Sequence, residues 1–352
     1  MTRQRITGLL TLLMPHHALP IVVAALLASG SVSAQQPNTA PNVAPLIPKI
    51  VGGWVHVYQP AADVFPGPDS TRFKAGQSYP KWQVNDHAIL KGPDGRWHAF
   101  GITHPAVPHG EPNPHEAEWL LFHAATPSGA LKQHCLPGQW KDEPKVLPPA
   151  ERPGEIREIH SPSILRHADR YWMFYGYSPI RLAVSQDLKT WQPQGEVFRQ
   201  EGSARDPSVS QHDGKFYMCY TTRQSILMRT SPDLLHWSEP STVFSLAPGE
   251  TGGPESPTLL PLHGGFYLVW CRWDAKLSAV GSTYQSRSFV YFSKDPLNFR
   301  DRAPIAELEG HAPELFQDEE GDWWISSAEH PNPGLSLAPV RWEPPTGATL
   351  RP

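Results

Sequence analysis

Hydrophobic and polar residues alternate in short runs along this chain, and the runs come in pairs. In "RDPSVSQHDGKFYMCY" (205–220) a polar head is followed by a short alternating run, a turn containing Asp and Gly, and a second run rich in aromatic residues. Alternation with a period of two predicts β-strands, and two such runs joined by a Gly-containing turn predict a β-hairpin. The segment is therefore expected to form two antiparallel strands.

The same pattern occurs at four other places in the chain. The related segments are "NDHAILKGPDGRWHAFG", "HSPSILRHADRYWMFYG", "ESPTLLPLHGGFYLVWC" and "HAPELFQDEEGDWWISS". Three repeats continue into a further strand and a shared turn, in "RLAVSQDLKTW", "ILMRTSPDLLHW" and "VYFSKDPLNF". After a longer first interval the heads recur every ~45–55 residues, and a period of roughly 40–50 residues with about four strands is typical of a β-propeller blade. Five repeats predict an all-β, five-bladed β-propeller.

The N-terminal residues do not share this pattern. Residues 1–34 contain two early arginines, an apolar stretch and the small-residue sequence Val32-Ser33-Ala34, which together indicate a cleaved export signal. Residues 35–49, rich in Pro, Asn and Ala, are expected to be a linker. Residues 50–352 are expected to form the propeller. These features predict a periplasmic or extracellular protein that has no membrane association after signal cleavage.

Composition narrows the class of ligand and the chemistry. A formal net charge of −4 gives no basic field of the kind that nucleic acid or anionic lipid requires, so neither is expected as a partner. The 40 prolines, about twice the usual share of ~5%, favour short strands joined by turns. Three cysteines (Cys135, Cys219 and Cys271) permit at most one internal disulfide, and their spacing is not that of a metal site.

The heads of the repeats carry the candidate chemistry. In a propeller the first strand of every blade lines the axis, so the head residues are expected to converge at one end of it. These residues are Asn85, Asp86, His160, Arg205, Asp206, Glu255 and His311. Neighbouring carboxylates repel one another, which raises the pKa of at least one, and this is how a general acid is obtained near neutral pH. Glycoside hydrolysis uses such a pair of carboxyl groups.

These residues and repeats resemble the five-bladed propeller glycoside hydrolases of two families. One is the arabinanase and β-xylosidase family (family 43), and the other is the invertase and levanase family (family 32). The resemblance covers roughly residues 50–343 and rests on Asp86 in "NDHAI", Asp206 in "RDP" and Glu255 in "ESP". It implies that Asp86 is the base or nucleophile, that Asp206 orients the substrate and tunes the acid, and that Glu255 is the general acid.

The resemblance also bears on the remaining residues of the pocket. Asn85, His160, Arg205 and His311 are expected to bind substrate, and Trp270 is expected near the mouth, where it could stack on a sugar. In the arabinanase type the counterpart of His311 lies near a bound cation or water, so a structural cation there is an option, although no cofactor is required and no dedicated metal site is predicted. "NDHAI" lacks the proline and glycine of the invertase motif and Ser256 replaces a cysteine, so subfamily and stereochemistry stay open, with "ESP" and "HAP" favouring inversion.

The sequence thus favours an exported glycoside hydrolase acting on arabinosides, xylosides or fructosides. Two alternatives remain. A non-catalytic propeller could bind carbohydrate in the same pocket, although it would have no need of three acids. A glycoside phosphorylase would need several basic residues around the pocket for phosphate, and only Arg205 stands at a head.

Overall fold

The computed structural model describes residues 44–106, 118–155, 158–274 and 284–345. The predicted export signal and residues 35–43 of the predicted linker lie outside the described residues, as do most of two loops between strands. The chain from Ala44 onward forms one compact unit. In this unit the described residues contain no helix long and apolar enough to cross a membrane.

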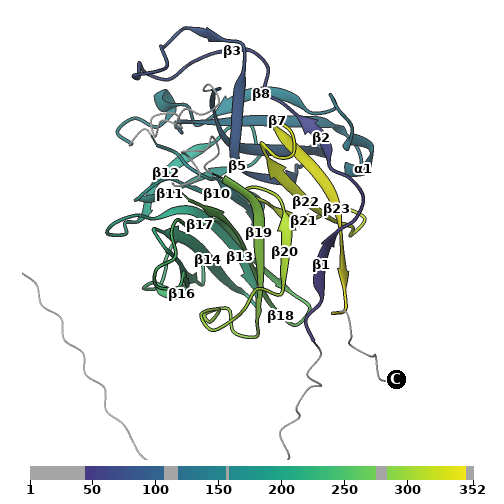
Figure 1. Ribbon diagram of the computed structural model, residues 1–352. Coiled ribbons are helices and arrows are strands. Elements are labelled where there is room, and N and C mark those ends of the chain that lie inside the picture. The colour runs from purple at the N-terminus through teal and green to yellow at the C-terminus, as the bar shows by residue number, and fades with distance from the viewer. Residues whose placement is uncertain (1–43, 107–117, 156–157, 275–283, 346–352) are drawn as a thin grey trace, which may run out of the picture. The chain divides into compact units, whose positions relative to one another are not determined.

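Four antiparallel sheets of four strands follow one another along the chain, as the sequence repeats predict (Figure 1). Blade one contains β5 (Trp82–Lys91), β6 (Arg96–Pro105), β7 (Leu120–Ser128) and β8 (Lys141–Val146). Blade two contains β9 (Ser163–His167), β10 (Arg170–Tyr175), β11 (Ile180–Ser185) and β12 (Gln192–Phe198). Blade three contains β13 (Arg205–His212), β14 (Lys215–Thr222), β15 (Ser225–Ser231) and β16 (Ser241–Ser245). Blade four contains β17 (Gly253–Leu262), β18 (Gly265–Trp273), β19 (Tyr284–Ser293) and β20 (Ala306–Glu309).

Blade five joins segments from the two ends of this unit. Its strands are β21 (Leu315–Gln317), β22 (Trp323–Ala328) and β23 (Leu335–Glu343), and β23 also pairs with β1 (Ile47–Ile50) and β2 (Val55–Tyr58). Strand β1 therefore begins at Ile47, three residues before the predicted start of the propeller at residue 50. This pairing closes the ring of blades, and together the five sheets make the predicted five-bladed, all-β propeller.

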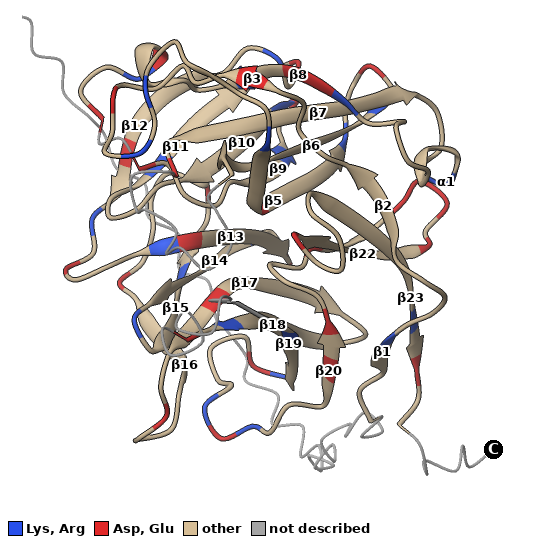
Figure 2. Cartoon of the chain, turned by 45° about the horizontal axis from the view of Figure 1, so that its top comes forward, with Lys and Arg blue, Asp and Glu red and all other residues tan. Residues whose placement is uncertain are grey.

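The remaining short elements lie outside the blades. They are the two-stranded sheet of β3 (Asp63–Val64) and β4 (Ser78–Tyr79), the helix α1 (Leu131–His134) and a 3₁₀ turn at Pro149–Glu151. Acidic and basic residues are interspersed over the described strands and loops (Figure 2). This mixture agrees with the small net charge of the sequence.

Among the described residues, five hydrophobic clusters each lie between two neighbouring blades, and a sixth packs Phe65 and Phe73 of the β3–β4 segment against blade one. Phe100 and Trp191 pack edge to face between blades one and two, and Phe174 and Trp237 do the same between blades two and three. Trp324 joins blades five and one. Aromatic side chains suit these positions because each blade must bury both faces of its sheet against its neighbours. The strongly aromatic second strands of the repeats are thereby explained.

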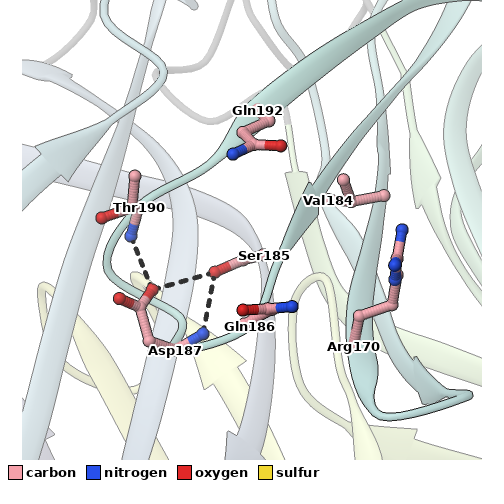
Figure 3. A pocket seen from close by; sticks show the side chains of 7 residues that line it. All are labelled: Arg170, Val184, Ser185, Gln186, Asp187, Thr190 and Gln192. Atoms are coloured by element: carbon pink, nitrogen blue, oxygen red, sulfur yellow. Dashed lines mark hydrogen bonds between the residues drawn. The ribbon is translucent and has the colours of Figure 1, made fainter.

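The shared Ser-x-Asp-Leu sequences form tight turns between the third and fourth strands. In blade two the Ser185 hydroxyl accepts hydrogen bonds from the amides of Asp187 and Leu188, while Oδ1 of Asp187 accepts those of Lys189 and Thr190. Figure 3 shows the bonds that join Ser185, Asp187 and Thr190. The leucine has a positive φ of 64° and its side chain is fully buried. The turn therefore anchors the edges of blades two and three through local hydrogen bonds. A pocket of about 220 Å³ lies beside the turn of blade two (Figure 3).

Candidate active site

The first strands of the blades are brought together around the axis. Contacts join β5 to β9, β9 to β13 and β13 to β17. Near the head of β5, β13 and β17 the register slips, so that two residues on the first strand face a single residue on the second. Such a bulge leaves residues out of the hydrogen-bond ladder and re-aims their side chains. It therefore turns the head residues toward a common space at one end of the axis.

The bulge also explains why proline follows the polar head. Asp206 and Pro207 lie between the paired positions Arg205 and Ser208, and Asp206 has a positive φ of 54°. A proline is tolerated there because no ladder N–H is needed at a bulge. Ser256, which precedes Pro257 in blade four, has a φ of 48°. Backbone conformations of this kind cost free energy in non-glycine residues and are concentrated at functional sites.

Arg205 links two of the three predicted acids. Its Nη1 atom lies 3.1 Å from Oδ2 of Asp206 and 2.5 Å from Oε1 of Glu255. The same Asp206 oxygen also accepts a hydrogen bond from the Thr221 hydroxyl at 3.1 Å. All of these groups are largely buried, so the guanidinium offsets much of the cost of bringing two carboxylates together.

Ser256 links the third predicted acid to this group. Its hydroxyl donates a hydrogen bond to Oδ1 of Asp86, and its amide lies 3.4 Å from Oδ2 of Asp206. Behind it, the Cys271 thiol lies 3.7 Å from the Ser256 oxygen. Asp86, Asp206 and Glu255 therefore come from blades one, three and four and meet in one buried pocket.

The carboxyl groups in this pocket have unusual pKa values. Burial raises the pKa of Asp86 well above its ordinary value, and the charges of Asp206 and Glu255 raise it further. Burial also raises the pKa of Glu255 to about 7, although Arg205 acts in the opposite direction. A buried group of interacting acids that takes up protons near neutral pH can supply a general acid.

A fourth carboxyl group, Glu118, joins the pocket beside the predicted residues Asn85 and His160. Its Oε2 atom lies 2.7 Å from Nδ1 of His160, and its Oε1 atom accepts a hydrogen bond from Asn85 at 3.4 Å. Glu118 precedes β7, the third strand of blade one. The repeat pattern does not reveal Glu118, because the repeats mark only the heads of first strands and Glu118 has no counterpart among them.

His311 lies behind Glu255 and is neutral at physiological pH. Its Nδ1 atom is 3.1 Å from the carbonyl oxygen of Ala328, and burial lowers its pKa to about 4. Among the described residues, His311, Glu255 and Cys271 bring three potential ligand atoms within 4.8 Å of one another. This is the place where a structural cation was considered from the sequence.

These three side chains fit a calcium ion poorly. Calcium prefers six to eight oxygen ligands, whereas this group offers one carboxylate, a thiol and an imidazole. The carboxylate already contacts Arg205, and burial raises the pKa of the thiol so that it stays protonated. The proton transfers proposed below therefore use protein side chains and are not routed through a metal ion.

The structure corrects the prediction for Trp270. Successive side chains of a strand point to opposite faces, and Cys271 is the residue that faces the pocket beside Ser256. Trp270 is only 2% exposed and packs against Phe244 and Phe289, with ring centroids 5.0 and 4.9 Å apart. It belongs to the core between blades three and four and does not reach a sugar.

Glu314 is a further ionisable group near the axis that the proposed chemistry does not use. It follows the head of blade five by two residues, and its backbone amide is 3.2 Å from the hydroxyl of Ser326. Burial raises the pKa of Glu314 to about 8, and no charged partner opposes this shift. The folded protein therefore holds this carboxyl protonated over a range where the unfolded chain ionises it.

We expect the Glu314→Gln variant to be more stable than the wild type at high pH only. Because the folded pKa is about 8 and the ordinary value is 4.5, ionisation of the wild-type residue disfavours folding increasingly from pH 4.5 to 8. The gain should reach about 1–3 kcal/mol at pH 9, reduced from the full linkage value because the side chain keeps some solvent contact. Urea unfolding at pH 5 and pH 9 measures it, with the exposed Glu201→Gln as control; equal gains at both pH values would contradict the expectation.

The family model described as "Glycosyl hydrolases family 43" matches residues 200–350, which include blades three to five. A thermostable family 43 glycoside hydrolase shares 14% identity with a TM-score of 0.56, over 74% of this chain and 89% of that chain. The arabinanase of Bacillus subtilis shares 15% identity with a TM-score of 0.53, over 74% and 94%. No curated protein sequence matches the chain significantly.

A third similar structure comes from another family. It is described with the family 130 mannoside phosphorylases, which contain glycoside hydrolases that target β-1,2-mannosidic linkages in Candida mannan. It shares 16% identity with a TM-score of 0.58, over 90% of this chain and 99% of that chain. Because these identities are low, the structural similarity shows a shared fold and nothing more specific.

The fold and the family match together define the class of protein. The resemblance to five-bladed propeller glycoside hydrolases is confirmed by the family 43 match and by the architecture that the chain shares with solved members. These findings support a glycoside hydrolase, and carbohydrate is accordingly its class of substrate. More specifically, residues 200–350 are similar in sequence to family 43.

Proposed function

We propose that this protein is exported and hydrolyses glycosidic bonds of oligosaccharides or polysaccharides with Glu255 as general acid and Asp86 as base or nucleophile. The observation that carries the proposal is the convergence of Asp86, Asp206 and Glu255 in one buried pocket, with the Glu255 pKa at about 7. A carboxylic acid that is still protonated near neutral pH can protonate the leaving oxygen.

The resemblance to propeller glycoside hydrolases assigns the acid role to Glu255 and the base or nucleophile role to Asp86. The pocket without substrate does not separate these two roles. The pKa values of both Asp86 and Glu255 are raised, so both carboxyls favour protonation before substrate binds. One of them must lose its proton to act as base or nucleophile while the other keeps it. Asp206, held by Arg205 and Thr221, remains the acid that orients substrate hydroxyls.

Hydrolysis is favoured over phosphorolysis by the charge of the pocket. Four carboxyl groups from the described residues lie there (Asp86, Glu118, Asp206 and Glu255). The basic side chains beside them include Arg205 and His160, while burial lowers the pKa of a further neighbour, His104. Arg205 is held between two carboxylates and His160 is paired with a third. This arrangement supports binding of a neutral sugar and water better than binding of a phosphate dianion.

A screen of chromogenic glycosides tests the proposal. It should include arabinofuranosides, xylosides and fructosides, which the sequence favours, together with β-mannosides because of the family 130 neighbour. Each is assayed with and without inorganic phosphate. Release of the free sugar at a rate independent of phosphate supports a hydrolase, whereas a sugar 1-phosphate product would indicate a phosphorylase. If the protein binds sugar but turns over none of these glycosides, the non-catalytic alternative is favoured.

We expect a narrow bell-shaped dependence of kcat/KM on pH. The general acid works protonated, so activity should fall as pH rises through about 7, the pKa of Glu255. The base works ionised, so activity should also fall at acidic pH, at a higher pH than for an ordinary aspartate because burial raises the pKa of Asp86. The two limbs belong to the coupled carboxyls together. Rates measured from pH 4 to 9 test this, and a flat profile between pH 5 and 9 would contradict it.

A further inference from the structure

Glu118 and His160 meet across the interface between blades one and two. Glu118 stands before β7 of blade one, and His160 stands at the head of blade two. The Glu118 side chain also contacts Asn85, which lies next to Asp86 in the blade-one bulge. The pair therefore lies on the blade-two side of the same pocket as the three acids.

The contacts of His160 leave one ring nitrogen without a partner. Its Nδ1 atom is 2.7 Å from Oε2 of Glu118, and its ring lies beside that of Tyr177 with centroids 5.0 Å apart. No hydrogen bond from Nε2 to any of the described residues is found. The side chains of His160 and Glu118 are only 9% and 12% exposed. A largely buried imidazole held on one nitrogen thus presents the other nitrogen to the pocket.

The charges of the neighbours favour an ion pair. Burial alone would raise the pKa of Glu118, but the proximity of His160 lowers it to about 2. Burial likewise would lower the pKa of His160, but Glu118 and, less strongly, Asp206 raise it despite the opposing charge of Arg205. The carboxylate and imidazolium forms therefore stabilise each other, and both ring nitrogens of His160 then carry a proton.

We propose that Glu118 is a positioning residue that holds His160 as a hydrogen-bond donor, so that its free Nε2–H group binds a hydroxyl of the sugar and selects substrates carrying that hydroxyl. This inference rests on the proposed function and adds a specificity determinant to it. A site built to hydrogen-bond a substrate hydroxyl discriminates strongly against an analogue without it, because the buried donor is then left unpaired.

A neutral hydroxyl is the group that fits this donor. Glu118 already balances the charge of His160, and Asp86, Asp206 and Glu255 lie in the same pocket. An anionic substituent on the sugar would meet these carboxylates. The ring of Tyr177 beside His160 provides an apolar surface next to the donor, as sugar rings commonly require.

The Glu118→Gln variant tests the proposal because it keeps the size and a hydrogen-bonding oxygen but removes the charge. For the nitrophenyl glycoside that the wild type hydrolyses best, we expect KM to rise about 10- to 100-fold, the effect of losing one charge-assisted hydrogen bond. The value of kcat should change much less. His160→Asn should behave similarly, and the double variant should lose little more than either single variant because both changes remove the same contact.

The Glu118–His160 pair can also be tested without any substrate. In a ¹⁵N NMR titration of the intact protein, assigned with His160→Asn, the pKa of His160 should lie above the ordinary histidine value. In Glu118→Gln it should fall, since burial and Arg205 then act with less opposition. A Glu118 that does not hold His160 protonated would give no such shift, and a shift without a change in KM would indicate a structural ion pair only.

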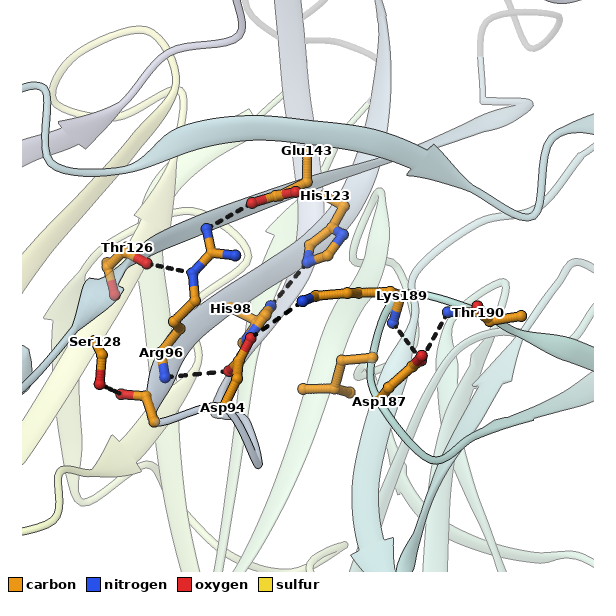
Figure 4. A network of polar contacts seen from close by, with 12 residues as sticks. Asp94, Arg96, His98, His123, Thr126, Ser128, Glu143, Asp187, Lys189 and Thr190 are labelled. Carbon is orange, nitrogen blue, oxygen red and sulfur yellow. Dashed lines mark hydrogen bonds and ion pairs between the residues drawn. The ribbon is translucent and has the colours of Figure 1, made fainter.

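A second histidine–carboxylate pair provides the matched control (Figure 4). His98 Nε2 lies 3.0 Å from Asp94, and His98 Nδ1 lies 2.8 Å from Nε2 of His123, near Arg96 and Lys189 at the junction of blades one and two. Asp94→Asn removes a carboxylate from a buried histidine outside the acidic pocket. It should leave KM and the titration of His160 unchanged.

The outcomes separate this inference from the proposed function. An ordinary or lowered pKa of His160 in the wild type, or a Glu118→Gln variant with unchanged KM, would overturn the role of Glu118. If the wild type hydrolyses none of the tested glycosides, the proposed function is refuted. The NMR titration would still decide whether Glu118 holds His160 protonated. An equal rise of KM in Asp94→Asn would also overturn the proposed role of Glu118, because the effect would then not be specific to the pocket.

Discussion

The Glu255→Gln variant should lose about 10²–10⁴-fold in turnover of natural glycosides while still binding sugar. Glutamine keeps the size and a hydrogen-bonding group but cannot deliver the proton that a poor leaving group needs. A nitrophenyl glycoside needs little protonation and should lose much less activity. The measurement is kcat for a series of substrates whose leaving groups differ in pKa, in wild type and variant.

The alkaline limb of the pH profile provides a second readout for this variant. If Glu255 is the acid, the fall in activity near pH 7 should disappear in Glu255→Gln for the nitrophenyl substrate. The variant should also stay folded, because glutamine can still accept the hydrogen bond from Arg205. An equal loss for all leaving groups would contradict the assignment of Glu255 as the acid.

The Asp86→Asn variant should lose about 10²–10⁴-fold with good and poor leaving groups alike. Asparagine keeps an oxygen that can accept the hydrogen bond from Ser256, but it can neither take a proton from water nor attack the sugar. Steady-state rates on the same substrate series measure this loss. A leaving-group dependence in Asp86→Asn, together with its absence in Glu255→Gln, would show that the two roles are reversed.

Azide distinguishes the two possible tasks of Asp86. If Asp86 is a nucleophile, azide added to Asp86→Asn should restore activity and give a glycosyl azide of opposite anomeric form to the normal product. If Asp86 is a base that activates water, the enzyme inverts, and the normal product itself has the opposite form to the substrate. The wild-type product is identified by NMR immediately after hydrolysis, before the anomers equilibrate.

Alternating patterns and repeats were enough to predict the blades. Each blade is a run of hairpins between residues close in sequence, so local alternation and turn residues specify its pairing. The repeated heads then predicted that Asp86, Asp206 and Glu255 would lie at matching positions, since equivalent strands in a propeller occupy equivalent places around the axis. The structure brings these three side chains together as expected.

The sequence did not show how the chain closes into a ring. Strands β1 and β2 carry no repeat signature, and their partner β23 lies almost 300 residues further along the chain, as in the pairing of Ile47 with Glu343. Pairing at such a separation is determined by which sheet edge remains open after the other strands have formed. Local pattern contains no information about that edge.

The sequence alone therefore determined the all-β class, the five repeats and the three acids, because strand alternation and hairpin turns are local properties of the chain. The tertiary structure decided which side chains face the pocket. It placed Trp270 in the core and Cys271 beside Ser256, and it paired Glu118 with His160 across two blades. These outcomes depend on bulges, strand faces and contacts between blades, which are fixed only when the whole ring is packed.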